Sequence, residues 1–267
     1  MTDPNSSART HSALTGATII VTRPSVASAP LKRRITALGG TALGLPGVGL
    51  YPAQDQATVR AALRAARNAD IVVFISPSAV RYAFATLPAL RFSRATRICA
   101  IGAGGAAALH RRHLREVAWP RQRQDSEGLL ALEEFAHVRR RRVALIGAPG
   151  GRDLLSVALG ERGAIAQNIH VYRRGKPRLD RRHFVALERA ASPLLTLLSS
   201  AEALTNLRSL LPQPLFARLA TGEGIVSSLR LAQAAHSAGF LRTHVAASAA
   251  AADMLAAATT ALAQHRL

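Results

Sequence analysis

The sequence predicts an α/β fold in which parallel strands are covered by helices on both faces. Short apolar runs alternate along the chain with longer stretches in which Ala, Leu and Arg recur at helical spacing. The apolar runs lack the polar and apolar alternation of a strand with one wet face, so both of their faces are expected to be buried. Strands of this kind are typical of parallel sheets between layers of helices.

Eight runs are predicted to form the strands. They are rich in Val, Ile and Leu, and small or turn-forming residues bound most of them. The expected strands are residues 17–23, 70–76, 96–101, 142–147, 164–172, 193–199, 224–227 and 243–246.

Ten segments between and around these runs have the apolar spacing of helices that pack one face against a sheet. The expected helices are residues 25–38, 57–68, 78–87, 103–114, 126–135, 151–162, 181–191, 201–210, 229–237 and 249–264.

Six strand-to-helix junctions share one feature: Ser, Pro or Gly lies where the next helix begins. Ser at such a position accepts a backbone hydrogen bond, and Gly lets the chain turn tightly. An ordinary helix start explains any one junction. Six together indicate a ligand site, because the carboxyl ends of parallel strands gather at one edge of a sheet and helix N-termini suit anions. The junctions are residues 23–25, 76–78, 102–104, 150–152, 199–201 and 227–229.

The composition limits the classes of function. The 267 residues include 35 Lys and Arg against 15 Asp and Glu, a formal net charge of +20, which indicates an anionic partner. That partner could be nucleic acid, an acidic membrane surface or a polyanionic small molecule. Hydrophobic residues make up 49%, enough for a real core. A single cysteine, Cys99, excludes a disulfide scaffold and a multi-cysteine zinc site, and we expect it to be a buried small hydrophobe.

The first residues predict neither a secretory signal nor a membrane anchor. Residues 1–15 are polar and lack an apolar core, so we expect a disordered leader there. No apolar run approaches the roughly 18 residues of a spanning helix. The expected location is therefore the cytoplasm.

Several motifs look informative and are disfavoured. Residues 102–107 match G-x-G-x-x-A between a strand and a helix, but the acidic residue expected further on is ambiguous. Residues 147–152 suggest a phosphate loop and lack its G-K-[ST] ending. His110 and His113 share a helix without further metal ligands nearby, so we expect them at the surface. The Arg run 139–142 is expected to be a solvated turn.

The order of short motifs resembles the uroporphyrinogen-III synthase family over about residues 17 to 260. No single motif is decisive; their order and spacing carry the resemblance. The matching pieces are V-T-R-P at 21–24, L-G-G at 38–40, L-P at 45–46, D-I-V-V-F-I-S-P-S-A-V at 70–80, I-G at 101–102, D-S-E-G-L-L at 125–130, G-G-R-D-L-L at 150–155, E-R-G-A at 161–164, V-Y-R-R at 171–174, S-S-A-E-A-L at 199–204, S-S-L-R-L-A at 227–232 and G-F at 239–240.

The resemblance implies two similar α/β domains, each a parallel sheet flanked by helices, joined by a two-strand connector with a cleft between the domains. The first strand and helix then belong with the C-terminal half. The implied ranges are 16–45 with 175–267 for one domain, 52–166 for the other, and 46–51 with 167–174 for the connector. Gly44, Gly47 and Gly49 suit a flexible hinge in the first connector.

The resemblance also implies an activity. Family members convert the linear tetrapyrrole hydroxymethylbilane into uroporphyrinogen III, removing water, inverting the last pyrrole ring and closing the macrocycle. The substrate's eight carboxylates give a reason for a basic site with many helix N-termini. No cofactor and no metal are implied, and we expect a monomer that meets hydroxymethylbilane synthase transiently and binds neither nucleic acid nor membrane. A nucleic-acid-binding protein or a two-domain nucleotide-binding enzyme remains an alternative.

The same resemblance assigns residue roles. Tyr172 matches the family's usual catalytic candidate, since a phenol can donate to a departing hydroxyl. The departure of Gly104-Gly105 from the threonine of many members leaves that contact in doubt. The substrate-binding candidates are Arg23, Ser76, Ser78, Gly102, Gly104, Gly105, Gly151, Arg152, Ser199, Ser200, Ser228 and Arg230.

Overall fold

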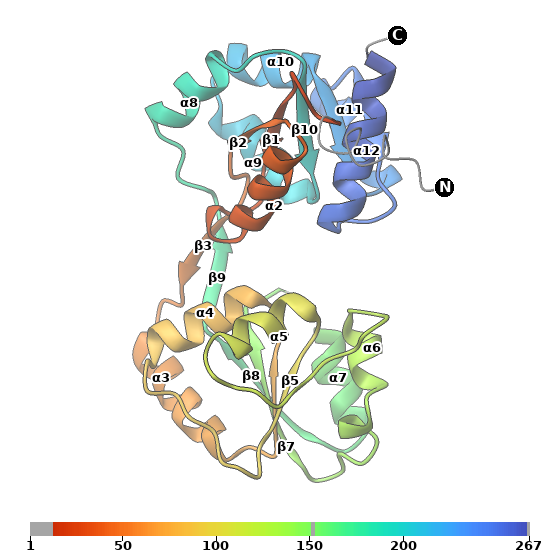
Figure 1. Ribbon diagram of the computed structural model, residues 1–267. Helices are drawn as coiled ribbons and strands as arrows, with labels where there is room; N and C mark the ends of the chain where they lie inside the picture. Colours follow the sequence, from red (N-terminus) through yellow and green to blue (C-terminus); the bar gives the residue numbers. More distant parts are fainter. Residues whose placement is uncertain (1–12, 151–152, 266–267) are drawn as a thin grey trace, which may run out of the picture. The chain divides into compact units, whose positions relative to one another are not determined.

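The structure, a computed structural model, describes residues 13–150 and 153–265. The chain divides into two compact units, of which unit 1 comprises the residues up to Gly49 and from Gly175 onward, and unit 2 comprises Leu50–Arg174. Each unit contains one five-stranded sheet with helices on both faces (Figure 1). The predicted α/β class is confirmed.

Unit 1 is built on a sheet in the order β12-β11-β10-β1-β2, and every neighbouring pair is parallel. β1 thus lies between β2, which follows it in the chain, and β10, which comes from the C-terminal segment of the unit. The strands are β1 (Thr18–Val21), β2 (Thr41–Gly44), β10 (Leu194–Leu198), β11 (Glu223–Val226) and β12 (Arg242–Val245). The helices are α2 (Ser25–Ala37), α8 (Arg181–Glu188), α9 (Ala201–Leu210), α10 (Gln213–Thr221), α11 (Leu229–Ala238) and α12 (Ala251–His265).

Successive residues of β1 face opposite layers of unit 1. Ile19 and Val21 pack with residues of α2 and α12, such as Ile35 and Leu255. Ile20 packs in the cluster that α8, α9, α10 and α11 complete on the other face. This arrangement explains why the strand is apolar throughout, because its side chains are buried in both directions.

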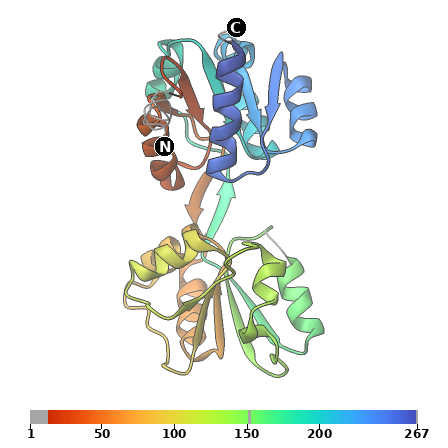
Figure 2. The same cartoon turned by 45° about the vertical axis from the view of Figure 1, so that its right-hand side comes forward.

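Unit 2 has a parallel sheet in the order β6-β5-β4-β7-β8. Helices α3, α4 and α5 cover one face, while α6 and α7 cover the other (Figure 2). The strands are β4 (Ile71–Phe74), β5 (Arg97–Ala100), β6 (Val117–Ala118), β7 (Arg142–Gly147) and β8 (Ile165–His170). The helices are α3 (Gln56–Ala65), α4 (Pro77–Thr86), α5 (Ala103–His110), α6 (Ser126–Leu130) and α7 (Asp153–Glu161), with 3₁₀ turns at Ala66–Asn68 and Glu133–Phe135.

The chain passes from one unit to the other twice, and each passage contains a strand. β3 (Gly49–Pro52) and β9 (Tyr172–Gly175) pair as a separate two-stranded sheet. The connector ranges expected from the sequence are longer than these strands. Residues 46–48 are buried, Val48 at 4% exposure, and residues 167–170 belong to β8.

Gly47 is part of the packing of unit 1, which corrects its expected role as a hinge. A Cβ at this position would lie 2.5 Å from the Cβ of Ala203 on α9. The carbonyl of Gly47 accepts a hydrogen bond from the amide of Asn206 at 2.9 Å, and its own N–H donates to the carbonyl of Thr22 at 2.8 Å. Glycine is needed here for a close approach of backbone to helix, and the segment is held in place rather than free.

The start of the fold also differs from expectation. The sequence predicts a disordered leader over residues 1–15, of which 1–12 lie outside the described residues. Leu14 is fully buried, in the cluster that includes residues of α2 and α12. Its N–H donates to the carbonyl of Leu38 at 2.8 Å, which ties the entry to β1 against the end of α2.

Three smaller expectations are confirmed. Cys99 is fully buried within β5, and desolvation raises the pKa of its thiol to about 12. His110 and His113 are exposed. Residues 139–142 are exposed, in the loop before β7 and at its first position.

Candidate active site

Tyr172 lies at the carboxyl end of the unit 2 sheet, where β8 gives way to β9. The residue before it, Val171, is fully buried, and its N–H donates to the carbonyl of Gly147 at the end of β7. The carbonyl of Val171 accepts from the N–H of Ala53 at 3.3 Å. The backbone is therefore held on both sides just before Tyr172, whose side chain is half-buried.

Ser76, at the carboxyl end of β4, meets Tyr172. The Oγ of Ser76 and the Oη of Tyr172 lie 3.2 Å apart. The same Oγ accepts the N–H of Ala79 at 3.1 Å, so Ser76 is the N-cap of α4, and Pro77 follows at the first helical position. The N-terminus of α4, which carries the positive end of the helix dipole, therefore lies beside the phenol.

Tyr82, also on α4, lies against the ring of Tyr172. The two ring centroids are 5.3 Å apart with an interplanar angle of 21°. The hydroxyl of Tyr82 donates to the carbonyl of Leu50 in β3 at 2.8 Å. Burial raises the pKa of Tyr82. The charge of Arg81 opposes this with a smaller effect, and Tyr172 and Tyr51 raise the pKa by less still. Sequence reasoning missed Tyr82, because its place among buried residues of α4 is typical of a core aromatic.

The glycines after β5 serve the fold in ways the sequence did not predict. Gly102 precedes α5, and a Cβ there would lie 2.6 Å from the Oε1 of Gln124. That oxygen accepts the N–H of Ala103 at 3.0 Å, so the amide of Gln124 already occupies one donor of this helix N-terminus. Gly105 packs against Ala100, whose Cβ would be 3.0 Å from an added one, whereas Gly104 is exposed.

Of the three remaining candidates in unit 2, the structure describes only Ser78. Ser78 is half-buried in the first turn of α4. Gly151 and Arg152 lie outside the described residues.

The unit 1 candidates follow three adjacent strands, since β11, β10 and β1 are neighbours in the sheet. Ser200 caps α9 by accepting the N–H of Ala203 at 3.2 Å, and Ser228 caps α11 by accepting that of Leu231 at 3.3 Å. Ser199 is half-buried before the first of these caps, and Arg230 is exposed on α11. Capping accounts for Ser200 and Ser228 without a ligand, and both helix N-termini carry the positive end of a helix dipole.

Arg23 joins two loops at this same edge of unit 1. Its guanidinium donates to the carbonyl of Ala249, in the segment after β12. Burial lowers the pKa of Arg23 from its usual value, although the group stays cationic at neutral pH. A partly desolvated cation at the carboxyl end of a parallel sheet is suited to a carboxylate ligand.

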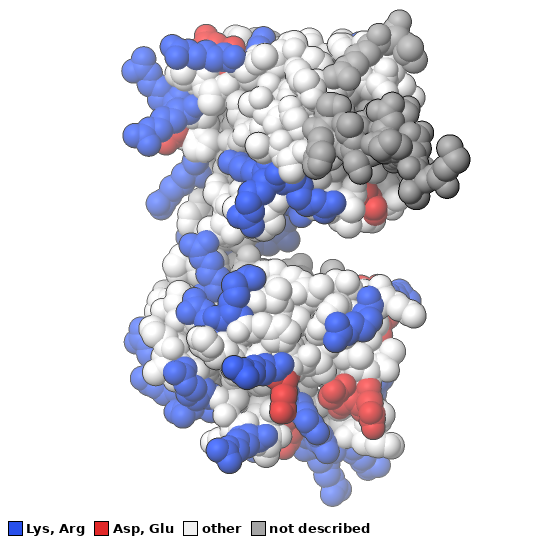
Figure 3. All heavy atoms as spheres, viewed as in Figure 1, with Lys and Arg blue, Asp and Glu red and all other residues white. Residues whose placement is uncertain are grey.

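Two arginines of unit 2 lie over aromatic rings. The guanidinium of Arg173 lies 4.9 Å from the ring centroid of Tyr51, and that of Arg121 lies 4.1 Å from the ring centroid of Trp119. Figure 3 shows Lys and Arg side chains outnumbering Asp and Glu on the visible surface of both units. Unit 2 therefore carries exposed cations, of which Arg173 directly follows Tyr172 in β9.

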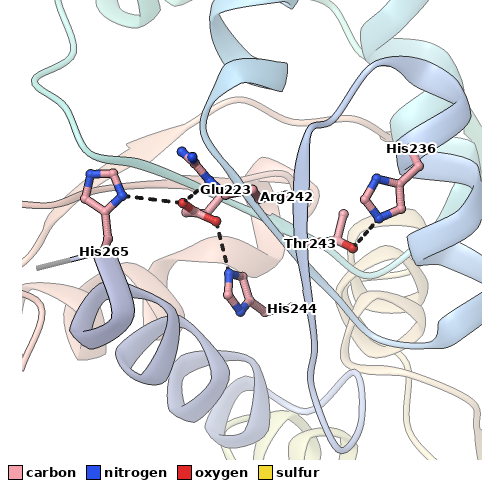
Figure 4. A network of polar contacts seen from close by, with 6 residues as sticks. All are labelled: Glu223, His236, Arg242, Thr243, His244 and His265. Carbon is pink, nitrogen blue, oxygen red and sulfur yellow. Dashed lines mark hydrogen bonds and ion pairs between the residues drawn. The ribbon is translucent and has the colours of Figure 1, made fainter. Parts of the chain in front are cut away.

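A second polar cluster lies at the opposite, amino-terminal edge of the unit 1 sheet (Figure 4). Glu223 lies at the start of β11 and is only 3% exposed. Its Oε1 accepts a hydrogen bond from the Nε–H of Arg242 at 2.6 Å. Its other oxygen meets the Nε2 of His244 at 3.0 Å, and the Nδ1 of His265 lies 3.5 Å from the first. Because these partners come from β12 and α12, the cluster fastens both elements to β11.

Other classes of site find no support in the described part of the chain. There, no group of three or more His, Cys, Asp or Glu side chains is arranged to hold a metal ion. Within the same residues, no helix has both the length and the apolar character needed to cross a membrane.

Comparisons with known proteins agree on one family. A family model described as Uroporphyrinogen-III synthase HemD matches residues 29–256. The uroporphyrinogen-III synthase of Escherichia coli is 30% identical over 197 residues, which cover 73% of this chain and 80% of that protein. The enzyme of the same name from Salmonella typhimurium is 31% identical with the same coverage.

Solved structures support the fold. The crystal structure of uroporphyrinogen-III synthetase from Helicobacter pylori has a TM-score of 0.58 at 16% identity, covering 91% of this chain and 99% of that one. A mutant uroporphyrinogen III synthase from Thermus thermophilus has a TM-score of 0.51 at 21% identity, covering 93% and 99%. With most of its length matched by the family model and by relatives in two bacteria, the chain belongs to the uroporphyrinogen-III synthase family of tetrapyrrole biosynthesis.

Proposed function

We propose that this chain is a carbon–oxygen lyase that dehydrates hydroxymethylbilane and closes it to uroporphyrinogen III with its terminal pyrrole ring inverted. The observation that carries this proposal is the placement of the Tyr172 hydroxyl, 3.2 Å from a helix-capping serine at the carboxyl end of a parallel sheet. Ligands of open α/β sheets bind at this edge.

The first step is loss of the substrate's hydroxyl group. Tyr172 donates its phenolic proton to the departing oxygen, the carbon–oxygen bond breaks, and water leaves. The pyrrole nitrogen lone pair supplies the electrons, so the electrophile that forms is the azafulvenium cation, which is the azafulvene with its nitrogen still protonated. Ser76 can then turn its own hydroxyl proton toward the phenolate oxygen, because the N–H of Ala79 requires only a lone pair of the serine.

The second part is ring closure. The substituted carbon of the terminal pyrrole attacks this electrophile to form a spiro intermediate. The bond from that carbon to its original methylene then breaks, the methylene bonds to the unsubstituted carbon of the ring, and the proton lost from that carbon returns to the Tyr172 phenolate. Holding the linear chain so that this carbon, and not the unsubstituted one, meets the electrophile is a matter of positioning. Dehydration and cyclisation leave the overall oxidation state unchanged, so the reaction as written consumes no redox cofactor.

The substrate's carboxylates need cations and N–H donors. In unit 1 we assign this role to Arg23, Arg230 and the helix N-termini after Ser199-Ser200 and Ser228. In unit 2 the supporting groups are the N-terminus of α4 with Ser76 and Ser78, and the α5 N-terminus at Gly102. At Gly102 a substrate carboxylate would displace the amide of Gln124 from the N–H of Ala103.

The test is the isomer composition of the product. Hydroxymethylbilane closes by itself to uroporphyrinogen I, in which no ring is inverted. Adding the full chain to freshly generated hydroxymethylbilane should divert the product to isomer III. Product that stays isomer I in the presence of folded chain would refute the proposal.

A further inference from the structure

We propose that Tyr82 is a positioning residue that holds the ring of Tyr172 in its reactive orientation. This inference rests on the proposed function of Tyr172 as the proton donor. Tyr82 is neither one of the candidates from the sequence motifs nor one of the groups proposed to bind carboxylates.

Helix α4 restrains Tyr172 at two points. Ser76, the N-cap of this helix, contacts the phenolic oxygen at 3.2 Å. Tyr82, in the middle of the same helix, stacks on the ring with centroids 5.3 Å apart. A tyrosine side chain moves by rotation about two bonds, so a contact at the oxygen and a contact on the ring face together leave one orientation favoured.

Tyr82 is itself fixed. It is 9% exposed, and its hydroxyl donates to the carbonyl of Leu50 at 2.8 Å. Leu50 belongs to β3, the strand that pairs with β9, and β9 begins with Tyr172. The ring that supports Tyr172 is thus tied to the partner of the strand on which Tyr172 lies.

A purely structural role for Tyr82 would predict something different. A core aromatic contributes packing, and its loss lowers stability and active fraction without regard to Tyr172. A positioning residue acts through Tyr172, so its loss should matter only while the Tyr172 hydroxyl is present. A double-mutant cycle separates these two roles.

The experiment measures kcat and KM for isomer III formation by the full chain carrying Tyr82→Leu or Tyr82→Phe, each alone and combined with Tyr172→Phe. Tyr82→Leu should lower kcat about tenfold with KM changed less than about twofold, because the phenol is misplaced rather than the substrate unbound. Tyr82→Phe keeps the stack and loses only the tie to Leu50, so kcat should fall about threefold. In the Tyr172→Phe background neither change should lower kcat further.

Phe84→Leu is the matched control. Phe84 is a buried aromatic of the same helix that packs in the same core, and its ring lies under the guanidinium of Arg112. Its loss should lower the melting temperature and leave kcat near that of the parent. If Tyr82→Leu does not fold, the Tyr82→Phe cycle decides alone.

Two kinetic results would overturn the inference. One is equal losses of kcat with and without the Tyr172 hydroxyl, and the other is unchanged kcat in a folded Tyr82→Leu protein. Failure of the proposed function is separately visible, since the parent chain would then give only isomer I or Tyr172→Phe would be fully active.

A second experiment tests the contact without measuring turnover. The chain has three tyrosines, so 3-fluorotyrosine labelling gives three resonances. An unmoved Tyr172 resonance in Tyr82→Leu would also refute the contact, independently of turnover.

Discussion

The hydroxyl oxygens of Tyr172 and Ser76 lie 3.2 Å apart although the residues are 96 positions apart in the chain. Parallel pairing of β4, β7 and β8 produces this contact, because it brings the ends of these strands to one edge. The contact joins a phenol to the positive end of a helix. Its consequences for activity can be measured, as can the consequences for stability of three other packing relationships.

Replacing Tyr172 with Phe removes the proposed acid and keeps the ring. We expect kcat for isomer III formation to fall by about 10²-fold, the lower end of what a positioned acid contributes. The stack on Tyr82 persists, so the melting temperature should change little. Tyr51→Phe is the control, a half-buried tyrosine of the same unit whose ring lies under Arg173. Full activity in Tyr172→Phe would remove the phenol from the mechanism.

Ser76 has two functions that substitutions can separate. Ser76→Ala loses the cap of α4 and the contact with Tyr172, so it should lower the free energy of unfolding by about 1 kcal/mol and also lower kcat. Ser76→Asn can still cap the helix but lacks a hydroxyl, so it should recover stability without recovering kcat. Ser76→Thr should recover both. A kcat that follows stability in all three variants would show that the serine only caps.

Gly47 should not tolerate a side chain. Gly47→Ala places a methyl group 2.5 Å from the Cβ of Ala203, and we expect a loss of about 1–3 kcal/mol in the free energy of unfolding. Gly160→Ala is the matched control, because nothing lies within 4 Å of its added Cβ in helix α7. That control should be stabilising by about 0.5–1 kcal/mol. Equal melting temperatures for the two variants would contradict the close packing of Gly47.

Glu223 should be important for the stability of unit 1. Glu223→Gln removes the buried charge that Arg242, His244 and His265 face. We expect a loss of about 2 kcal/mol, below the full cost of breaking a buried pair, because the Arg242 side chain is 54% exposed and can be solvated. Urea unfolding of this variant and of Glu188→Gln, an exposed glutamate on α8, provides the comparison. Indistinguishable midpoints would show that the cluster contributes nothing.

The thiol of Cys99 makes stability depend on alkaline pH. Its pKa is about 12 when folded and about 8.5 in an unfolded chain, so between these values only the unfolded state loses the proton. The contribution of the protonated Cys99 thiol to the free energy of unfolding is fully present below about pH 8.5. Above that pH it falls by about 1.4 kcal/mol per pH unit, until the folded thiol also ionises. Relative to Cys99→Ala, the parent should therefore lose about 2 kcal/mol from pH 8 to pH 10. Parallel stability curves for the two proteins would contradict this burial.

The fold was predictable wherever burial on both faces left a simple pattern. Strands such as β4 and β10 are apolar at almost every position, and both are completely buried. β2 escaped prediction because it is an edge strand, exposed at Thr41 and only half-buried afterwards. α10 escaped because Pro212 and Pro214 suggest a loop, although Pro is tolerated in the first turn of a helix.

The site was only partly predictable. Motif order singled out Ser76 and Tyr172, yet their contact depends on strand order, which local patterns do not contain. Tyr82 has the spacing of a core residue, and Gln124 stands in a polar, basic stretch that resembles a surface loop. Their roles come from tertiary contacts with Tyr172 and Ala103. Gly47 shows the reverse error, since a glycine expected to give freedom instead permits tight packing.

The most direct test of the central claim is the ratio of uroporphyrinogen isomers formed from hydroxymethylbilane as the concentration of the full chain is raised. After oxidation to the porphyrins, chromatography separates isomer III from isomer I. The account predicts that isomer III rises with chain concentration until it replaces isomer I, and that Tyr172→Phe needs far more protein to reach the same ratio. Isomer I alone at every concentration of folded chain would contradict it.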